Sequence, residues 1–202
     1  MGGFRLFAIA RVVNMDNFKS TARRRKLFTD HSVLSSLLHR IGKDDDKDRR
    51  LSACQQLLDF LTNKDHSREI QKQNESILST ISSVLSERLS TSIKLELSQC
   101  IAAVSVHAGQ DLKRFFGWAF NKFQKSSNDE YKTYVLYAVF QALRKNNSNP
   151  RLPPLMNGIM KDLQVTLENV DTPDLLVSVM NIVHYVSQHY PKVFSAFFKV
   201  CL

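Results

Sequence analysis

Residues 112–123 read Leu-Lys-Arg-Phe-Phe-Gly-Trp-Ala-Phe-Asn-Lys-Phe, and this stretch decides the fold class. Its apolar residues recur at steps of three and four, the spacing that brings side chains onto one face of an α-helix. The residues on this face are Leu112, Phe115, Phe116, Ala119, Phe120 and Phe123. The charged residues fall on the opposite face. We therefore predict an amphipathic helix that buries its phenylalanine side chains against neighbouring helices.

The same periodicity continues along the rest of the chain. The first expected helix has an apolar stripe that begins with Val33, and Gly42 is expected to end it. Thr172 and Pro173 form the start signal of a later helix, whose apolar face includes Leu176. In order, the expected helices are 30–41, 44–62, 67–88, 92–107, 112–125, 129–145, 155–168, 173–189 and 193–198.

Taken in pairs, these helices recur at a regular interval. The pairs start near Asp45, Thr91, Asp129 and Thr172, with steps of 46, 38 and 43 residues. These steps bracket the roughly 40–47 residue period of HEAT and armadillo repeats. A plain helical bundle would have similar helix lengths, but the clustered steps favour a solenoid. We predict an all-α fold, a HEAT/armadillo-like α-solenoid of about four antiparallel helix pairs.

Composition divides the chain into a leader and a helical body. The hydrophobic fraction of 43% and the charged fraction of 23% are ordinary for a globular protein. Residues 1–28 hold seven basic residues and one acidic residue, whereas the remainder holds 21 basic and 18 acidic residues, a net charge of only +3. We expect residues 1–28 to be a basic, disordered leader and residues 29–202 to be a helical-repeat domain. The proline- and asparagine-rich stretch 146–154 marks a weak internal break in that domain.

The leader permits several interpretations. It is rich in arginine and nearly free of acids, which partly fits a mitochondrial transit peptide. Its cluster Arg23, Arg24, Arg25 and Lys26 is also typical of a nuclear-import or nucleic-acid-binding patch. A solvated leader without any address is the third interpretation. No apolar run approaches the roughly 20 residues that span a bilayer, so we predict no membrane partner.

Acidic and sulfur-containing residues raise the question of a metal site. Asp44, Asp45 and Asp46 are adjacent, but carboxylates at a helix start commonly cap free N–H groups, and a calcium loop needs ligands in alternation and a later glutamate. Cys54 and Cys100 lie in apolar helical patterns and Cys201 is isolated, which favours free thiols over a disulfide or zinc site. Free thiols are typical of the cytoplasm or nucleus, and we predict a cytoplasmic or also nuclear location.

No catalytic constellation interrupts the helical pattern. His184 and His189 are five residues apart, whereas a helical zinc pair needs a spacing near three or four. The HExxH, Gly-rich phosphate loop and protein-kinase HRD and DFG motifs are missing from the sequence. Trp118 could stack on a base or a peptide, but packing between helices is the favoured role. We therefore predict no enzyme activity, no catalytic, cofactor-binding or metal-binding residues, no cofactor and no small-molecule substrate.

Several segments together resemble a known kinase family. They are Leu34–Leu51 (LSSLLHRIGKDDDKDRRL), Phe116–Leu143 (with FGWAFNKF and NDEYKTYVLYAVFQAL), Glu168–Leu176 (ENVDTPDLL) and His189–Ser195 (HYPKVFS). In this order they resemble the N-terminal region of the nonsense-mediated mRNA decay kinase, a very large phosphatidylinositol 3-kinase-related protein kinase. The resemblance spans about residues 33–198, and ENVDTP with its following leucines is its most telling part.

The resemblance implies an α-solenoid arm that is remote from the kinase core. In that family the arm docks a pair of regulatory subunits, one of them GTPase-like, and the kinase phosphorylates the RNA helicase that drives decay. No kinase motif lies in this chain, so no catalytic residue is carried over. The chain departs from the family at residues 1–28, which lack a long Ser/Arg-rich stretch, and after Phe198, where the family continues. These departures predict a truncated isoform or an incomplete gene model.

Two functions from different classes remain open at this stage. The first is a non-catalytic helical scaffold that docks the regulatory subunits, as the resemblance implies. The second is an RNA-binding helical-repeat protein that uses its basic leader, in which case binding should depend on salt. A body so close to neutral lacks the broad basic footprint of a groove-binding domain, which favours the scaffold.

Overall fold

A computed structural model describes residues 33–168, 170 and 172–198, and all regular structure within them is helical. The basic leader and Cys201 lie outside these residues. Residues 33–43 form a first helical segment. It is followed by α2 (Lys47–Thr62), α3 (Ser67–Leu85), α4 (Thr91–His107), α5 (Leu112–Lys125), α6 (Asp129–Lys145), α7 (Met156–Leu167), α8 (Pro173–His189) and α9 (Pro191–Phe198), with short 3₁₀ helices η1 (Lys64–His66), η2 (Gly109–Asp111) and η3 (Pro153–Leu155). The predicted all-α class is confirmed.

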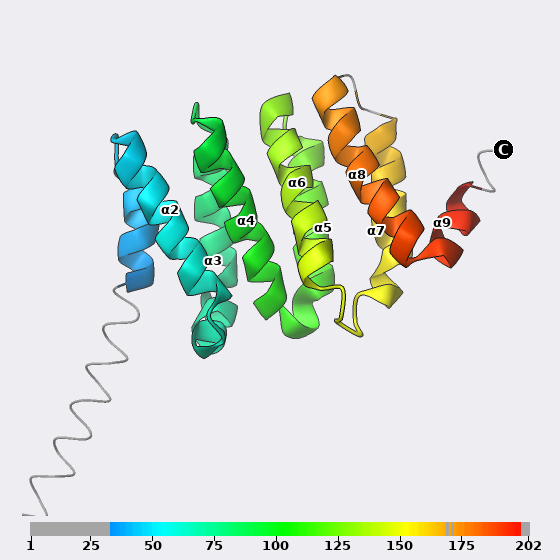
Figure 1. Ribbon diagram of the computed structural model, residues 1–202, viewed down its shortest axis with the longest axis horizontal. Helices are drawn as coiled ribbons and strands as arrows, with labels where there is room; N and C mark the ends of the chain where they lie inside the picture. Colours follow the sequence, from blue (N-terminus) through cyan, green and yellow to red (C-terminus); the bar gives the residue numbers. More distant parts are fainter. Residues whose placement is uncertain (1–32, 169, 171, 199–202) are drawn as a thin grey trace, which may run out of the picture.

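The helices lie in two layers. Figure 1 shows α2, α4, α6 and α8 side by side in one layer, which we call the inner layer, with α3, α5 and α7 behind them in an outer layer. Within the inner layer each helix packs extensively on the next, whereas α5 and α7 of the outer layer touch only sparsely. This arrangement is consistent with an α-solenoid, in which each unit contacts its neighbours along one axis.

Helix α5 joins the two layers as its sequence predicts. Its buried residues are Leu112, Phe115, Phe116, Ala119, Phe120 and Phe123, which is the whole predicted apolar face. Burying each phenylalanine contributes roughly 1.5–3 kcal/mol, so this face is the main reason that the segment is helical and fixed in place. The apolar residues of α5 belong to one continuous core that also includes Leu97 of α4 and Leu136 of α6.

Some helices pair differently from the prediction. The predicted pairs start where the inner-layer helices start, so they combine α2 with α3 and α4 with α5. In the structure α3 packs mainly on α4 and α5 on α6, which differs from the prediction, whereas α7 contacts α8 and α9 equally and α8 packs on α9 as predicted. Connection length does not explain this register, because the connections from α2 to α3 and from α4 to α5 are only four residues long.

A series of hydrogen bonds connects successive inner-layer helices near their C-terminal ends. We call it the inner ladder. Its members join side chains to groups 46, 41 and 42 residues away: His107 Nε2 to the Leu61 carbonyl (2.6 Å), Asn146 Nδ2 to Ser105 Oγ (2.8 Å) and Tyr185 Oη to the Leu143 carbonyl (3.1 Å). The groups are buried, so each bond satisfies polar atoms that would otherwise be costly to bury. The recurrence supports a repeat of about the predicted length.

Four local predictions need correction. The first helix continues through Lys43, because Gly42 keeps a negative φ and does not form a left-handed cap. Val33 is 45% exposed and is not part of the buried stripe. Leu176 is 46% exposed, although Leu175, which precedes it in the first turn of α8, is fully buried. Thr172 is the N-cap residue of α8, but its hydroxyl makes no capping hydrogen bond.

The predicted break at 146–154 coincides with the connection between α6 and α7. Helix α6 ends at Lys145, and only the short η3 interrupts the turns that follow. Leu152 in this connection is fully buried and belongs to the same core as the helices on either side. The connection therefore contributes to packing, and its role as a boundary within the predicted domain stays a prediction.

Candidate functional site

The adjacent aspartates have a capping role. Asp46 is the N-cap of α2, and its Oδ1 accepts hydrogen bonds from the backbone N–H groups of Asp48 (3.0 Å) and Arg49 (2.9 Å). Asp44 Oδ1 accepts in turn from the backbone N–H of Asp46. These bonds satisfy the free donors at the helix start, as the sequence predicts. In the part of the chain that the structure describes, no group of three or more His, Cys, Asp or Glu side chains could hold a metal ion.

The two described cysteines are packing residues between α2 and α4. Cys54 and Cys100 are fully buried, and the Cys100 thiol lies 3.6 Å from the Cys54 carbonyl. Burial, helped by the nearby Glu96 carboxylate, raises the pKa of Cys54 to about 12. Burial also raises the pKa of Cys100 well above its usual value of 9.0. Both thiols are therefore protonated at neutral pH and poor nucleophiles, as expected for small apolar residues.

Grooves separate helices of the outer layer in the described residues, and an ion pair spans the first of them. This first groove lies between α3 and α5 and has a volume of about 310 Å³. Trp118 lines it, partly buried against the core and 6.2 Å from the Phe115 ring. Arg114 Nη2 of α5 forms an ion pair with Glu75 Oε1 of α3 at 2.7 Å across this groove. Trp118 thus has the predicted packing role between helices.

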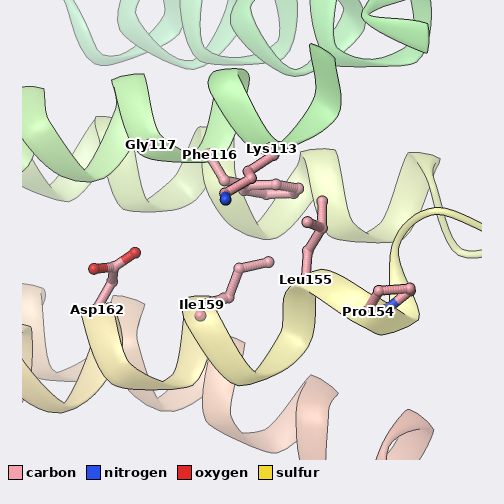
Figure 2. A pocket seen from close by; sticks show the side chains of 8 residues that line it. Lys113, Phe116, Gly117, Pro154, Leu155, Ile159 and Asp162 are labelled. Carbon is pink, nitrogen blue, oxygen red and sulfur yellow. The ribbon is translucent and has the colours of Figure 1, made fainter. Parts of the chain in front are cut away.

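The second groove lies between α5 and α7 and is the candidate functional site. We call it the α5–α7 groove; its volume is about 350 Å³. Figure 2 shows the side chains of both helices pointing toward the space between them. The lining residues are Lys113, Phe116, Gly117, Pro154, Leu155, Gly158, Ile159 and Asp162. Apolar groups form most of this lining, and a positive and a negative group complete it.

Two glycines keep this groove open. Gly117 lies in the interior of α5, and Gly158 lies in the first turn of α7. A Cβ atom added at either position would meet no heavy atom within 4 Å outside its own helix, and neither residue has a positive φ. Packing and backbone geometry therefore do not require glycine here. Glycine in a helix interior lowers the free energy of unfolding by about 1 kcal/mol relative to alanine. Gly117 therefore lowers stability although neither packing nor backbone geometry requires glycine there.

The two charged groups of the groove have no partner within the described residues. Lys113 makes no ion pair or hydrogen bond through its ammonium group there, and the same holds for the carboxylate of Asp162. Figure 2 shows Asp162 at one end of the groove and Pro154 at the other, with Lys113 between them on the facing helix. Partial burial raises the pKa of Asp162, as expected for a carboxylate without a compensating positive charge.

The apolar periodicity of the sequence does not predict this site, because the groove lies between the outward parts of two helices. Periodicity identifies the residues that face the core, but it does not reveal how far apart two outer-layer helices lie. One signal was available in the deciding stretch itself. Gly117 interrupts a run of good helix formers and bulky aromatic residues, and an unexplained glycine inside a helix commonly has a packing or functional reason.

Comparison with known proteins identifies a relative for nearly the whole chain. Over 191 residues the chain is 31% identical to the serine/threonine-protein kinase SMG1 of Danio rerio. The match covers 94% of this chain and 5% of that kinase, so the chain spans about one twentieth of the relative's length. The predicted resemblance to part of a large kinase is confirmed. No protein-family description and no solved structure matches the chain. None of the described helices is both long and apolar enough to cross a bilayer.

Proposed function

We propose that this chain is a non-catalytic helical scaffold equivalent to the N-terminal arm of a nonsense-mediated mRNA decay kinase. The likeness to part of the kinase SMG1 over 94% of the chain carries this proposal. The proposed architecture is a HEAT/armadillo-like α-solenoid, and the separations of 46, 41 and 42 residues in the inner ladder support it. Its proposed location is the cytoplasm, with a fraction in the nucleus.

The proposed partners are the regulatory subunits that dock on the arm of such kinases. A scaffold requires a rigid support and an accessible surface for the partner. The inner layer provides a continuous buried core, and the outer layer presents the open α5–α7 groove. No reaction step is proposed for this chain, and phosphotransfer is assigned to a longer relative.

A pull-down tests the scaffold. The full chain is immobilised and incubated with purified regulatory subunits of the decay kinase at physiological salt. We expect retention of the subunits above the level of a helical control protein with matched surface charge. Equal retention by the two baits would contradict docking of these subunits.

The basic leader supports a second candidate, binding of RNA. Residues 1–28 supply most of the net charge of +9, although they lie outside the described residues. Phosphate contacts by lysine and arginine weaken as salt rises, because counterions compete for the phosphates. Changing Arg23, Arg24, Arg25 and Lys26 to alanine should therefore abolish binding to a single-stranded RNA. Affinity that is unchanged in this variant, or no binding of the original chain at low salt, would exclude the leader as an RNA site.

A further inference from the structure

We propose that the α5–α7 groove is the docking site for an amphipathic helix of a protein partner. The partner helix places one apolar side chain between Gly117 and Gly158, an acidic group near Lys113 and a basic group near Asp162. This inference deepens the proposed scaffold function, on which its biological meaning rests. Three features of the groove carry it: its two glycines, its charges and its apolar lining.

The α5–α7 groove differs from its neighbour in the residues that line it and not in its volume. The neighbouring groove between α3 and α5 has a similar volume, but Trp118 lines it and the Arg114–Glu75 ion pair spans it. Between α5 and α7, glycines occupy two positions where a longer side chain would fit. A volume of about 350 Å³ is at the lower end for ligand pockets. It suits one or two inserted side chains of a larger partner.

The charges of the groove are arranged along its length. Lys113 precedes Gly117 by one helical turn, and Asp162 follows Gly158 by one turn. In Figure 2 both helices run in the same direction, so the two charged residues lie on opposite sides of the glycines along the groove. With a rise of about 1.5 Å per residue, each charged residue lies about 6 Å along its own helix from the glycine of that helix. A helix with an acid, an apolar residue and a base on three successive turns has the same spacing.

The mixture of charges favours a protein helix over a nucleic acid. Phe116 and Ile159 form an apolar floor that is already almost fully buried, and the partly buried Leu155 supplies the apolar surface that a partner side chain would cover. The two unpartnered charges have opposite sign, so the groove adds no net positive charge. A phosphate backbone needs several basic contacts, and the Asp162 carboxylate would repel it. Helix-in-groove recognition instead uses apolar anchors at helical spacing with charged flanks.

The experiment measures binding of a designed probe to the isotope-labelled full chain by nuclear magnetic resonance. The probe is an alanine-based helical peptide of about 16 residues that carries Glu, Leu and Lys on three successive turns. Saturable shifts are expected in the backbone amide signals of Gly117 and Gly158. The same peptide with its leucine changed to alanine should bind about tenfold more weakly, because the apolar anchor is removed.

Two variants in α5 separate occlusion of the groove from unfolding. Gly117→Leu fills the groove, and it should weaken peptide binding at least about tenfold while leaving the chain as stable or more stable. Asn121→Leu adds the same side chain to the same helix at an exposed position that lines neither groove, and it should change the affinity less than about twofold. In addition, Asp162→Asn should lower the affinity for the peptide that carries Lys about threefold. It should leave unchanged the affinity for a peptide with Gln in place of that Lys.

The outcomes distinguish this inference from the proposed scaffold function. An absence of saturable shifts at the two glycines, or equal peptide affinity in the Gly117→Leu variant, would overturn the docking site even if the pull-down retains the regulatory subunits. Shifts that are produced by a short uridine oligonucleotide and not by the peptide would overturn it in favour of nucleic acid. Peptide binding that Gly117→Leu abolishes would support the groove even if the regulatory subunits are not its partners.

Discussion

The inner and outer layers are built from similar helices, but they are connected in different ways. Inner-layer helices pack directly on one another and share the buried hydrogen bonds of the inner ladder. Outer-layer helices reach the core through apolar stripes such as that of α5, yet grooves separate them from one another. The difference suggests a division of labour: the inner layer holds the stack together, and the outer layer leaves surface between its helices.

The largest effect is expected where the outer layer inserts into the core. Phe120 of α5 is 2% exposed, so Phe120→Asp would remove its packing and bury an unpaired charge. The expected loss exceeds about 4 kcal/mol of unfolding free energy, because the cavity alone costs about 3–5 kcal/mol. Urea denaturation measures it. Asn121→Asp adds the same charge at the next, exposed residue and should change stability by less than about 0.5 kcal/mol. Similar effects of the two changes would show that the buried face of α5 is misassigned.

Breaking the inner ladder should have the next largest effect. Asn146 is buried and donates from Nδ2 to Ser105 Oγ and to the Ala142 carbonyl. Asn146→Ala leaves Ser105 Oγ without this donor, while the Ala142 carbonyl still accepts from the backbone N–H of residue 146, and the expected cost is about 1–3 kcal/mol. Hydrogen exchange should show faster opening at the ends of α4 and α6. The control Asn181→Ala changes an exposed residue of the same layer. An equally small effect at both positions would refute a stabilising role for the ladder.

The buried thiol of the inner layer predicts a loss of stability in alkaline solution. Burial raises the pKa of Cys54 from 9.0 to about 12, so the unfolded chain ionises first as the pH rises. The contribution of the Cys54 thiol to the free energy of unfolding is fully present below pH 9. It is lost between about pH 9 and 12, at about 1.4 kcal/mol per pH unit. Denaturation curves from pH 7 to about pH 10.5 measure the slope. Cys54→Ala should make the slope shallower, because Cys100, whose pKa burial also raises, still contributes to it. Parallel slopes in the two proteins would contradict this assignment.

Substitutions at the outer-layer glycines should have the opposite sign. Gly117→Ala is expected to raise the unfolding free energy by about 1 kcal/mol, and Gly158→Ala by about half of that because it lies in the first turn of α7. Thermal denaturation measures both gains. Gly109→Ala is the control: Gly109 has a φ of 53°, where alanine is strained, and this change should destabilise the fold. Destabilisation by Gly117→Ala would mean that the groove is filled in solution.

The smallest effect is expected at the ion pair that spans the neighbouring groove. The side chains of Arg114 and Glu75 are 73% and 74% exposed, so solvent screens their attraction. Arg114→Ala should lower stability by less than about 1 kcal/mol at low salt, and the difference should shrink at high salt. A loss that is larger and independent of salt would show that the outer layer is held together by its surface contacts.

Periodicity in the sequence predicted the helices well, because each stripe records a burial requirement. The stripes of α3, α4 and α5 are buried as predicted, and the start of α8 at Pro173 is correct. What periodicity did not give was the partner of each helix. A stripe indicates that a face is covered but not by which helix, so the predicted partners of α3 and α5 were displaced by one helix and Leu176 was assigned to a covered face.

The α5–α7 groove could not be predicted from the sequence for a related reason. The groove results from the spacing of two helices that are 41 residues apart at Gly117 and Gly158, and neither helix alone encodes that spacing. Lys113 and Asp162 look like ordinary solvated charges on polar faces. Only their position across the same empty space gives them a common role.

The one-sided inner ladder has a mechanical consequence. The buried hydrogen bonds join the helices of the inner layer to one another, whereas α5 and α7 of the outer layer have only sparse contacts. We expect bending of the stack to change the distance between α5 and α7 in the outer layer before it strains the hydrogen bonds of the inner ladder. Elastic bending of the stack would therefore change the widths of both outer-layer grooves, between α3 and α5 as well as between α5 and α7.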